Sequence, residues 1–292
     1  MRENLAIKQG EKGNERMNAI LNYPGAKWRS AKRIISLFPK HRSYLEPFFG
    51  SGAVLFNKPP SAIETINDID GDITNFFQVL RERPDDLAEA LALTPYSRDV
   101  FDDAHENRGS DAFDRACRFA IRSRMGHGFK TYQKTGFKID VYARERSYCV
   151  NCWNRMPAGI KEAAERLKQV QIENKPAVEL IKRFNHDNVL IYADPPYLLS
   201  TRRGRQYRCE INDADHVELL DALKQHKGYV VLSGYASELY DEELKDWNRI
   251  TFNSYNQNSD PREEVLWLNY ETELSLFDQI EEEEDGSDGE AD

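Results

Sequence analysis

The sequence predicts an α/β fold with a mostly parallel sheet that helices cover on both faces. Short apolar segments of strand length alternate with longer segments whose apolar residues recur at helical spacing, which is typical of βαβ units. The last two strand-like segments, 247–253 and 263–270, have no helix between them and indicate an antiparallel hairpin at one edge. With 292 residues, the chain has room for one such domain and an insertion.

The expected elements follow one another along the chain with recognisable ends. Pro39 and Pro84 end two helices, because proline cannot continue the hydrogen-bond ladder, and Pro176 opens another in its first turn. Strands are expected at 43–46, 62–70, 170–173, 188–193, 228–235, 247–253 and 263–270. Helices are expected at 30–37, from 53 onward, and at 72–84, 85–93, 98–107, 111–124, 160–169, 176–184, 213–226 and 238–244.

A segment in the middle of the chain interrupts this alternation. After two helical stretches, residues 124–157 lose any sustained helical period and are rich in glycine, aromatic and basic residues. We therefore expect an inserted region of loops and short elements there. The expected parts are a polar lead (1–18), a first part of the core (19–97), the insertion (98–160), a second part of the core (161–275) and an acidic disordered tail (276–292).

The distribution of charge is more informative than its sum. The formal net charge is −10, but residues 281–292 hold eight acidic residues and no basic ones, so the rest of the chain carries −2. From Arg115 to Lys161 the chain contains eleven Lys and Arg residues and only two acidic residues. Such a segment can be an ordinary solvated face. Its aromatic and glycine content favours a surface that contacts phosphates.

The cysteines and the apolar segments exclude several classes of protein. The four cysteines include one C-x-x-C pair, Cys149 and Cys152, without the second pair that a zinc site requires, so we expect reduced thiols and no metal. The sequence contains no run of about 18 apolar residues, so no membrane-spanning helix is expected. The N-terminal segment lacks the apolar core of a signal peptide, and a cytoplasmic protein is expected.

One motif stands at the end of a buried strand. The stretch IYADPPYLLS, residues 191–200, places Asp194, Pro195, Pro196 and Tyr197 directly after an apolar run. The two prolines end the strand and stiffen the turn after it. Ligands of open α/β sheets bind at the carboxyl ends of strands. The motif therefore indicates a ligand site, although a strand end before an ordinary turn would have the same sequence.

Three further stretches fit a site at the same edge of the sheet. EPFFGSG (46–52) is a glycine turn between a strand and a helix, where backbone N–H groups can approach a ligand. NDID (67–70) ends the next strand with an acid suited to ribose hydroxyls or to a helix N-cap. NYPGAKW (22–28) forms a turn that presents Lys27, which by itself could be a surface lysine.

In this order, the four stretches resemble the Dam-like, D12 class of DNA adenine-N6 methyltransferases. That family combines a P-G-x-K segment, E-P-F-x-G-x-G, N-D-x-[DN] and D-P-P-Y, with a target-recognition insertion before D-P-P-Y. The similarity covers residues 19–270. It implies a Rossmann-like fold that binds S-adenosylmethionine, and it favours D-P-P-Y chemistry over that of the N-P-P-Y enzymes, which modify protein glutamine and other amines.

The resemblance assigns roles to individual positions. The implied cofactor residues are Tyr23, Lys27, Pro47, Phe48, Gly50, Ser51, Gly52, Asp68, Ile69 and Asp194, with Asp68 on the ribose and Ile69 on the adenine ring. The implied catalytic residues are Asp194, Pro195, Pro196 and Tyr197. Asp194 and the carbonyl of Pro195 would accept the two N–H bonds of the target amine, and Tyr197 would stack on the base, which must leave the duplex.

Basic residues in the insertion and after the catalytic motif are the expected contacts to double-stranded DNA. They are Arg122, Arg124, Lys130, Lys134, Lys138, Arg144, Arg202, Arg203 and Arg205. A monomer is expected, and a cognate restriction endonuclease is a candidate partner. Two other functions fit parts of the sequence: methylation of RNA or a small amine, and DNA binding by an inactive methyltransferase scaffold.

Overall fold

The computed structural model describes residues 17, 19–130, 133–142, 147–202, 204–255 and 261–272. The side chains of residues 129, 253–255, 261 and 262 are also outside that description. Most of the polar lead and the whole acidic tail lie outside the described residues. No helix in the described part of the chain is long and apolar enough to cross a membrane.

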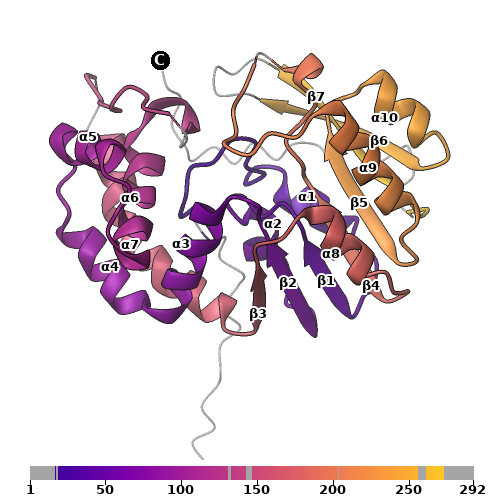
Figure 1. Ribbon diagram of the computed structural model, residues 1–292, viewed down its shortest axis with the longest axis horizontal. Coiled ribbons are helices and arrows are strands. Elements are labelled where there is room, and N and C mark those ends of the chain that lie inside the picture. The colour runs from indigo at the N-terminus through magenta and orange to yellow at the C-terminus, as the bar shows by residue number, and fades with distance from the viewer. Residues whose placement is uncertain are drawn as a thin grey trace, which may run out of the picture.

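Seven strands form a single sheet in the order β3-β2-β1-β4-β5-β7-β6 (Figure 1). The first five pair in parallel, and β7 runs antiparallel to both β5 and β6. The predicted parallel sheet and its antiparallel edge hairpin are thus confirmed. The strands are β1 (Ser43–Glu46), β2 (Ile63–Asn67), β3 (Val170–Glu173), β4 (Val189–Ala193), β5 (Tyr229–Gly234), β6 (Asn248–Tyr255) and β7 (Pro261–Leu268).

The helices lie close to their predicted positions with one exception. They are α1 (Ala31–Ser36), α2 (Ala53–Asn57), α3 (Gly71–Glu82), α4 (Pro84–Leu93), α5 (Arg98–Glu106), α6 (Ala112–Met125), α7 (Tyr148–Leu167), α8 (Ala177–Arg183), α9 (Asp213–Lys224) and α10 (Glu238–Glu243). Two short 3₁₀ turns, η1 (His127–Phe129) and η2 (Leu199–Thr201), complete the set.

Helix α7 corrects the expectation of loops up to residue 157. The Ser147 side chain caps its first turn by accepting the Val150 N–H, and Cys149, Trp153 and Met156 are buried at helical spacing. Pro157 lies inside the helix and hides this period in the sequence. The helix also continues past residue 160, the expected end of the insertion.

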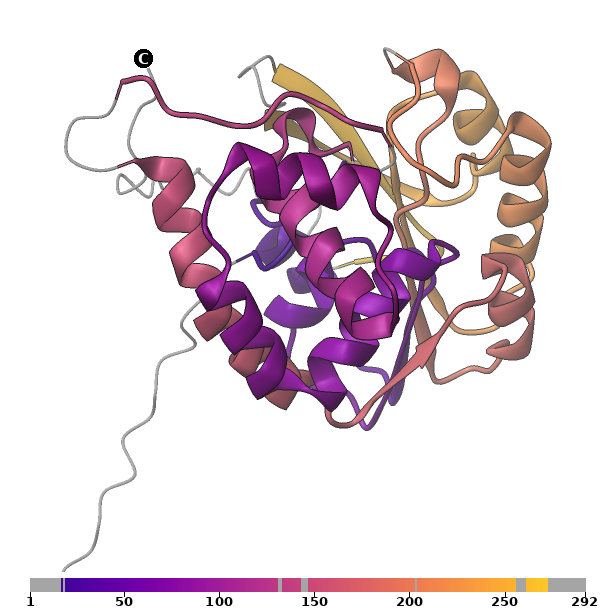
Figure 2. The same ribbon diagram turned by 60° about the vertical axis from the view of Figure 1, so that its left-hand side comes forward.

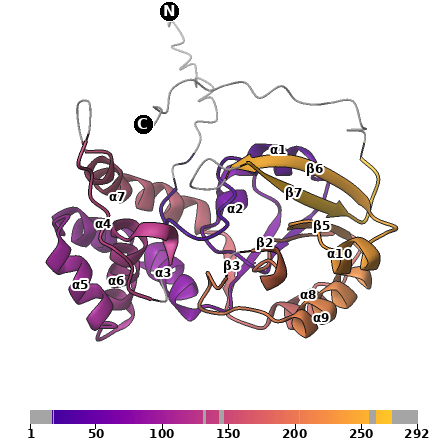
Figure 3. The ribbon, with the colours of Figure 1, turned by 90° about the horizontal axis from the view of Figure 1, so that it is seen from above.

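Each face of the sheet has its own apolar core. In β4, Leu190 and Tyr192 point into the core that holds α1, α2 and α3, whereas Ile191 and Ala193 point into the core that holds α8, α9 and α10. Figure 3 shows these two sets of helices on opposite sides of the strands. This alternation follows from the two-residue period of a strand that is buried on both faces.

Helices α4, α5, α6 and α7 gather beside the β3 edge of the sheet (Figures 1 and 2). Helix α4 packs along α7, and α6 packs along α3, so the helical region joins the same core as the first face of the sheet. This arrangement places the carboxyl ends of the central strands beside the helical region.

Candidate active site

A cavity lies at the carboxyl ends of β1, β2 and β4, and all four sequence motifs contribute to its wall. We call it the strand-end cavity. The predicted residues that line it are Tyr23, Lys27, Phe48, Gly50, Ser51, Asp68, Ile69, Asp194 and Pro196. Residues that the sequence did not single out include Glu46, Asp70, Tyr192, Tyr207, Cys209 and Ile211.

The strand order explains why the cavity forms here. From β1 the chain continues to β2 and β3 on one side, and β4 and β5 add to the other side of β1. Loops that leave neighbouring strands in opposite directions open a crevice between them. The glycine turn of the EPFFGSG stretch, called the glycine loop below, follows β1. Asp68 follows β2 and Asp194 follows β4, so the three meet at this crevice.

The glycine loop depends on backbone geometry that only glycine adopts without strain. Gly50 and Gly52 have φ angles of 51° and 72°. A Cβ on Gly52 would lie 2.5 Å from the Phe49 ring and 2.6 Å from the Phe56 ring. Asn67 holds the start of the loop by donating to the Pro47 carbonyl over 2.9 Å. Pro47 and Gly52 do not line the strand-end cavity and instead shape the loop.

Asp68 presents a buried carboxylate to the strand-end cavity. Its Oδ2 accepts the Gly50 N–H over 2.9 Å, and its Oδ1 accepts the Asp70 N–H over 2.9 Å. Burial raises the pKa of Asp68 to about 7, although both N–H bonds act in the opposite direction. The next side chain, Ile69, is 44% exposed and forms an apolar part of the cavity wall.

Asp194 lies at the other end of the strand-end cavity, between two donors. The Lys27 ammonium is 2.9 Å from its Oδ2, and the Ser233 hydroxyl donates to its Oδ1 over 2.6 Å. Lys27 is almost completely buried and also donates to the Gly25 carbonyl over 2.8 Å. Burial alone would lower the pKa of Lys27, but the carboxylates of Asp194 and Glu264 raise it above its usual value.

Tyr197, the aromatic member of the D-P-P-Y motif, packs against this pair. The Lys27 ammonium lies 5.0 Å from the centroid of the Tyr197 ring, and that ring makes an edge contact with Tyr235. Among the described residues, the cavity wall includes Pro196 but neither Pro195 nor Tyr197. The carboxylate and the ring are therefore held together by the rigid turn that the two prolines form after β4.

Glu46 is a buried carboxyl group in the cavity wall, and it gives a pH-dependent prediction. Burial raises the pKa of Glu46 to about 8, the Tyr44 hydroxyl bond opposes the rise, and the charge of Asp194 adds to it. Between about pH 5 and about pH 8 the folded protein therefore keeps a proton on Glu46 that the unfolded chain has lost. The stability that this proton contributes decreases as pH rises through this window.

We expect the unfolding free energy of Glu46→Gln, relative to wild type, to increase between about pH 5 and about pH 8. Urea denaturation at several pH values measures this difference, and a constant difference would contradict the assignment.

Several predicted DNA contacts are internal in this structure. Arg122 is buried and donates to Ala104 and Asp72, and Arg124 donates to the backbone carbonyls of Ala19 and Cys152. The Arg202 side chain is 4% exposed and forms a bidentate pair with Glu210. In this structure these guanidinium groups donate mainly inside the protein, whereas a phosphate contact needs donors at the surface. Their role as DNA contacts stays a prediction.

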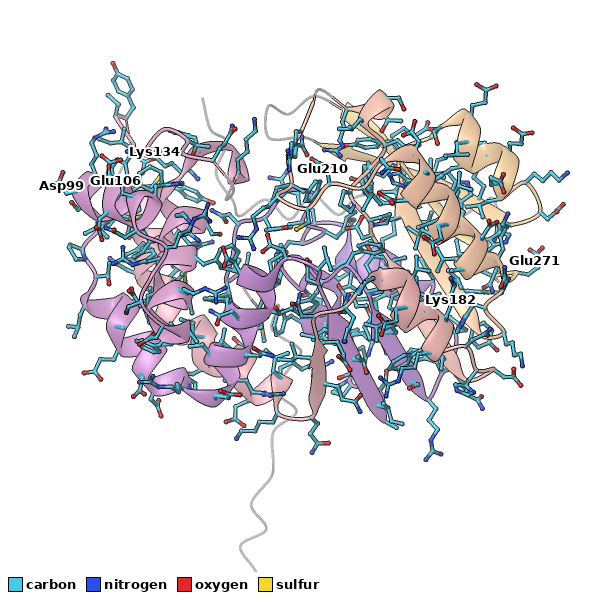
Figure 4. The ribbon with its side chains drawn as sticks, viewed as in Figure 1. Asp99, Glu106, Lys134, Lys182, Glu210 and Glu271 are labelled. Atoms are coloured by element: carbon cyan, nitrogen blue, oxygen red, sulfur yellow. The ribbon has the colours of Figure 1, made fainter. Side chains whose placement is uncertain are left out.

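The remaining predicted contacts lie nearer the surface. Lys134 is exposed and pairs with Asp102 and Glu106, and Figure 4 shows it among the helices of the inserted region. Lys130 and Lys138 are half-buried, and Arg205 is exposed with bonds to two backbone carbonyls. Arg144 and Arg203 lie outside the described residues. These six stay predictions: Lys130, Lys134, Lys138, Arg144, Arg203 and Arg205.

Asp72, in the first turn of α3, holds a cluster of arginines that the sequence did not reveal. Its carboxylate lies 2.7 Å from Arg208, 3.1 Å from Arg115 and 3.4 Å from Arg122. Arg208 also pairs with Asp70, which caps the same helix. The cluster therefore connects the loop after the D-P-P-Y motif to α3 and α6.

Comparison with known proteins identifies the family. The sequence model of the D12 class N6 adenine-specific DNA methyltransferases matches residues 23–258. The chain belongs to this family. As a D12 class adenine methyltransferase it is an enzyme that methylates N6 of adenine in DNA, and the predicted family, fold class and activity are confirmed.

Individual relatives agree with this assignment. The D12 class chain is 26% identical over 79% of its length to the type II methyltransferase M1.LlaDCHI of Lactococcus lactis subsp. cremoris, and it covers 87% of that protein. It is 27% identical to the DNA adenine methylase of Vibrio cholerae, with 63% of this chain and 66% of the relative covered. It is 23% identical to the modification methylase StsI of Streptococcus sanguinis, of which it covers 43%.

Proposed function

We propose that the protein transfers a methyl group from S-adenosylmethionine to a flipped-out adenine at a specific site in duplex DNA, with Asp194 as the acceptor of the amine hydrogens. The observation that supports this most strongly is the arrangement of the strand-end cavity. Asp194 shares it with the glycine loop and with Asp68. A nucleoside-binding end and an amine-binding end thus belong to one continuous space.

The residues of the cavity suit the cofactor. Each oxygen of Asp68 accepts one backbone N–H, which leaves further lone pairs for ribose hydroxyls. Ile69 and Phe48 offer apolar surface to a purine ring. Gly50 leaves room beside Tyr23, where a Cβ would lie 3.0 Å from the ring. When bound, S-adenosylmethionine supplies an electrophilic methyl group on a sulfonium.

The chain's own groups would hold and orient the target amine. The Asp194 carboxylate and the Pro195 carbonyl each accept one N–H bond, which turns the nitrogen lone pair away from the ring of the base. The prolines fix these two acceptors relative to each other, and such alignment can contribute several kcal/mol to catalysis. Tyr197 gives the base a ring on which to stack, and this contact offsets part of the cost of leaving the duplex.

The nature of the nucleic acid can be tested by competition. Exposed cations on the inserted region and in the loop after the catalytic motif support a polyanionic substrate. Methyl transfer to duplex DNA should persist in excess RNA and decline in excess unlabelled duplex. The opposite order would favour the RNA alternative. The restriction endonuclease partner and the monomeric state stay predictions.

Asp68 gives a direct test of the cofactor site. We expect Asp68→Ala to weaken S-adenosylmethionine binding by about 10- to 100-fold, because it removes charge-assisted hydrogen bonds. Titration calorimetry measures the affinity, and thermal unfolding verifies the fold. Asp99→Ala is the matched control, since Figure 4 shows Asp99 at the outer edge of the helical region. Equal affinities of the two variants would place the cofactor elsewhere.

A further inference from the structure

Lys27 occupies the part of the site that the target amine needs. Its ammonium lies 2.9 Å from Asp194 Oδ2 and 5.0 Å from the Tyr197 ring centroid. On the proposed mechanism, Asp194 must accept an N–H of the target adenine, and the base must reach the ring of Tyr197. The ammonium makes both of these contacts in this structure. An amine that bonds to Asp194 Oδ2 while its base lies on the Tyr197 ring would take the place of the ammonium, so Lys27 would have to move to admit it.

A buried ammonium cannot move away from one carboxylate unless another receives it. Lys27 is 5% exposed, and removing the partner of a buried charge is strongly unfavourable. In the described part of the chain, Lys27 forms an ion pair with one second acid, Glu264, whose Oε2 is 3.9 Å from Nζ. A shift of about an ångström would bring this pair to hydrogen-bond distance.

The position of Glu264 and the hydrogen bonding of its carboxylate both fit this role. Strand β7 runs antiparallel to β5, so its first residues reach the edge of the sheet where Asp194 and Ser233 lie. The side chain of Glu264 is 12% exposed, and its Oε2 accepts no hydrogen bond from any described residue. A buried carboxylate oxygen without a donor is costly to stability, and such an atom calls for an explanation.

We propose that Glu264 is a positioning residue that receives the Lys27 ammonium when the target amine displaces it from Asp194. This inference rests on the proposed function of Asp194. Lys27 stays protonated throughout, and only its hydrogen-bond partner changes. The exchange gives the Lys27 ammonium a carboxylate partner in both states, and it opens the Asp194 carboxylate to the amine hydrogens only when the base is present.

The test compares Glu264→Gln with Glu263→Gln, the exposed acid one residue earlier on the same strand. Single-turnover rates of DNA methylation are measured with both S-adenosylmethionine and duplex DNA saturating. We expect the rate of Glu264→Gln to decrease about 10- to 100-fold, as is usual when a supporting charge of a catalytic site is removed. The affinity for S-adenosylmethionine should equal that of the control, and the melting temperature should be no lower.

Further outcomes separate the competing explanations. Glu264→Asp retains the carboxylate, and its rate should lie between those of wild type and Glu264→Gln. A rate of Glu264→Gln equal to that of Glu263→Gln would overturn the inference, as would a loss of rate that is matched by a loss of cofactor affinity. An inactive wild type would instead count against the proposed function itself.

Discussion

Asp194→Asn is expected to lower the single-turnover rate of DNA methylation by about 10²- to 10³-fold, the usual cost of removing one preorganised polar group from a reacting centre. The amide keeps the shape of the side chain but loses the charge that polarises the target N–H and pairs with Lys27. The affinity for S-adenosylmethionine should change by less than about threefold, below the energy of one lost hydrogen bond. Rapid-quench methylation assays and calorimetry measure the two quantities.

Asp187→Asn serves as the matched control for this experiment. Asp187 is exposed and precedes β4, so it lies at the opposite end of the strand that Asp194 follows. The same chemical change there should leave the rate close to that of wild type. Equal rates for the two variants would show that the carboxylate of Asp194 takes no part in the reaction.

Asp72→Ala is expected to lower the free energy of unfolding by about 3–5 kcal/mol, since it leaves the buried guanidinium of Arg122 without its carboxylate partner. Arg122 is buried, and Arg208 and Arg115 share the same carboxylate. Urea denaturation measures the change. Asp86→Ala is a suitable control, because Asp86 is an exposed acid with a surface partner, Arg83, and such pairs contribute about 0–1 kcal/mol. A loss below about 1 kcal/mol for Asp72→Ala would contradict this account of the cluster.

The Asp72 cluster also connects stability with the site. Arg208 belongs to the loop that contributes Tyr207 and Cys209 to the cavity wall, and it pairs with the two acids at the start of α3. Loss of these pairs would release that loop from the helical region. Variants of Asp72 that still fold are therefore expected to methylate DNA more slowly than wild type.

The sequence predicted the part of the site that local chemistry determines. Local chemistry explains the position of each motif: prolines follow a buried strand, glycines adopt positive φ, and acids lie at strand ends. The sheet topology then brings these motifs together around the cavity. Helix α7 was missed over its first turns because Pro157 interrupts a period that packing against α4 makes continuous. Boundaries of this kind depend on the neighbour, which the segment itself does not contain.

The charged partners of the site could not be predicted in the same way. Arg122 pairs with Asp72, which lies fifty residues earlier in the sequence. Lys27 lies near the start of the chain, whereas its second acid, Glu264, lies near the end. No local pattern distinguishes an arginine that will be buried in such a cluster from one that faces DNA, because both occur in basic, aromatic segments. Only the packing of α3, α6 and the loop after β4 decides which donors remain at the surface.

The most direct test of the central claim is to identify the methylated product. The protein would be incubated with S-adenosylmethionine that carries an isotopically labelled methyl group and with unmethylated genomic DNA, and the DNA would then be digested to nucleosides for mass spectrometry. The account predicts labelled N6-methyldeoxyadenosine from wild type and none from Asp194→Ala. Label in a methylated cytosine, or an equal yield of methyladenine from the variant, would contradict it.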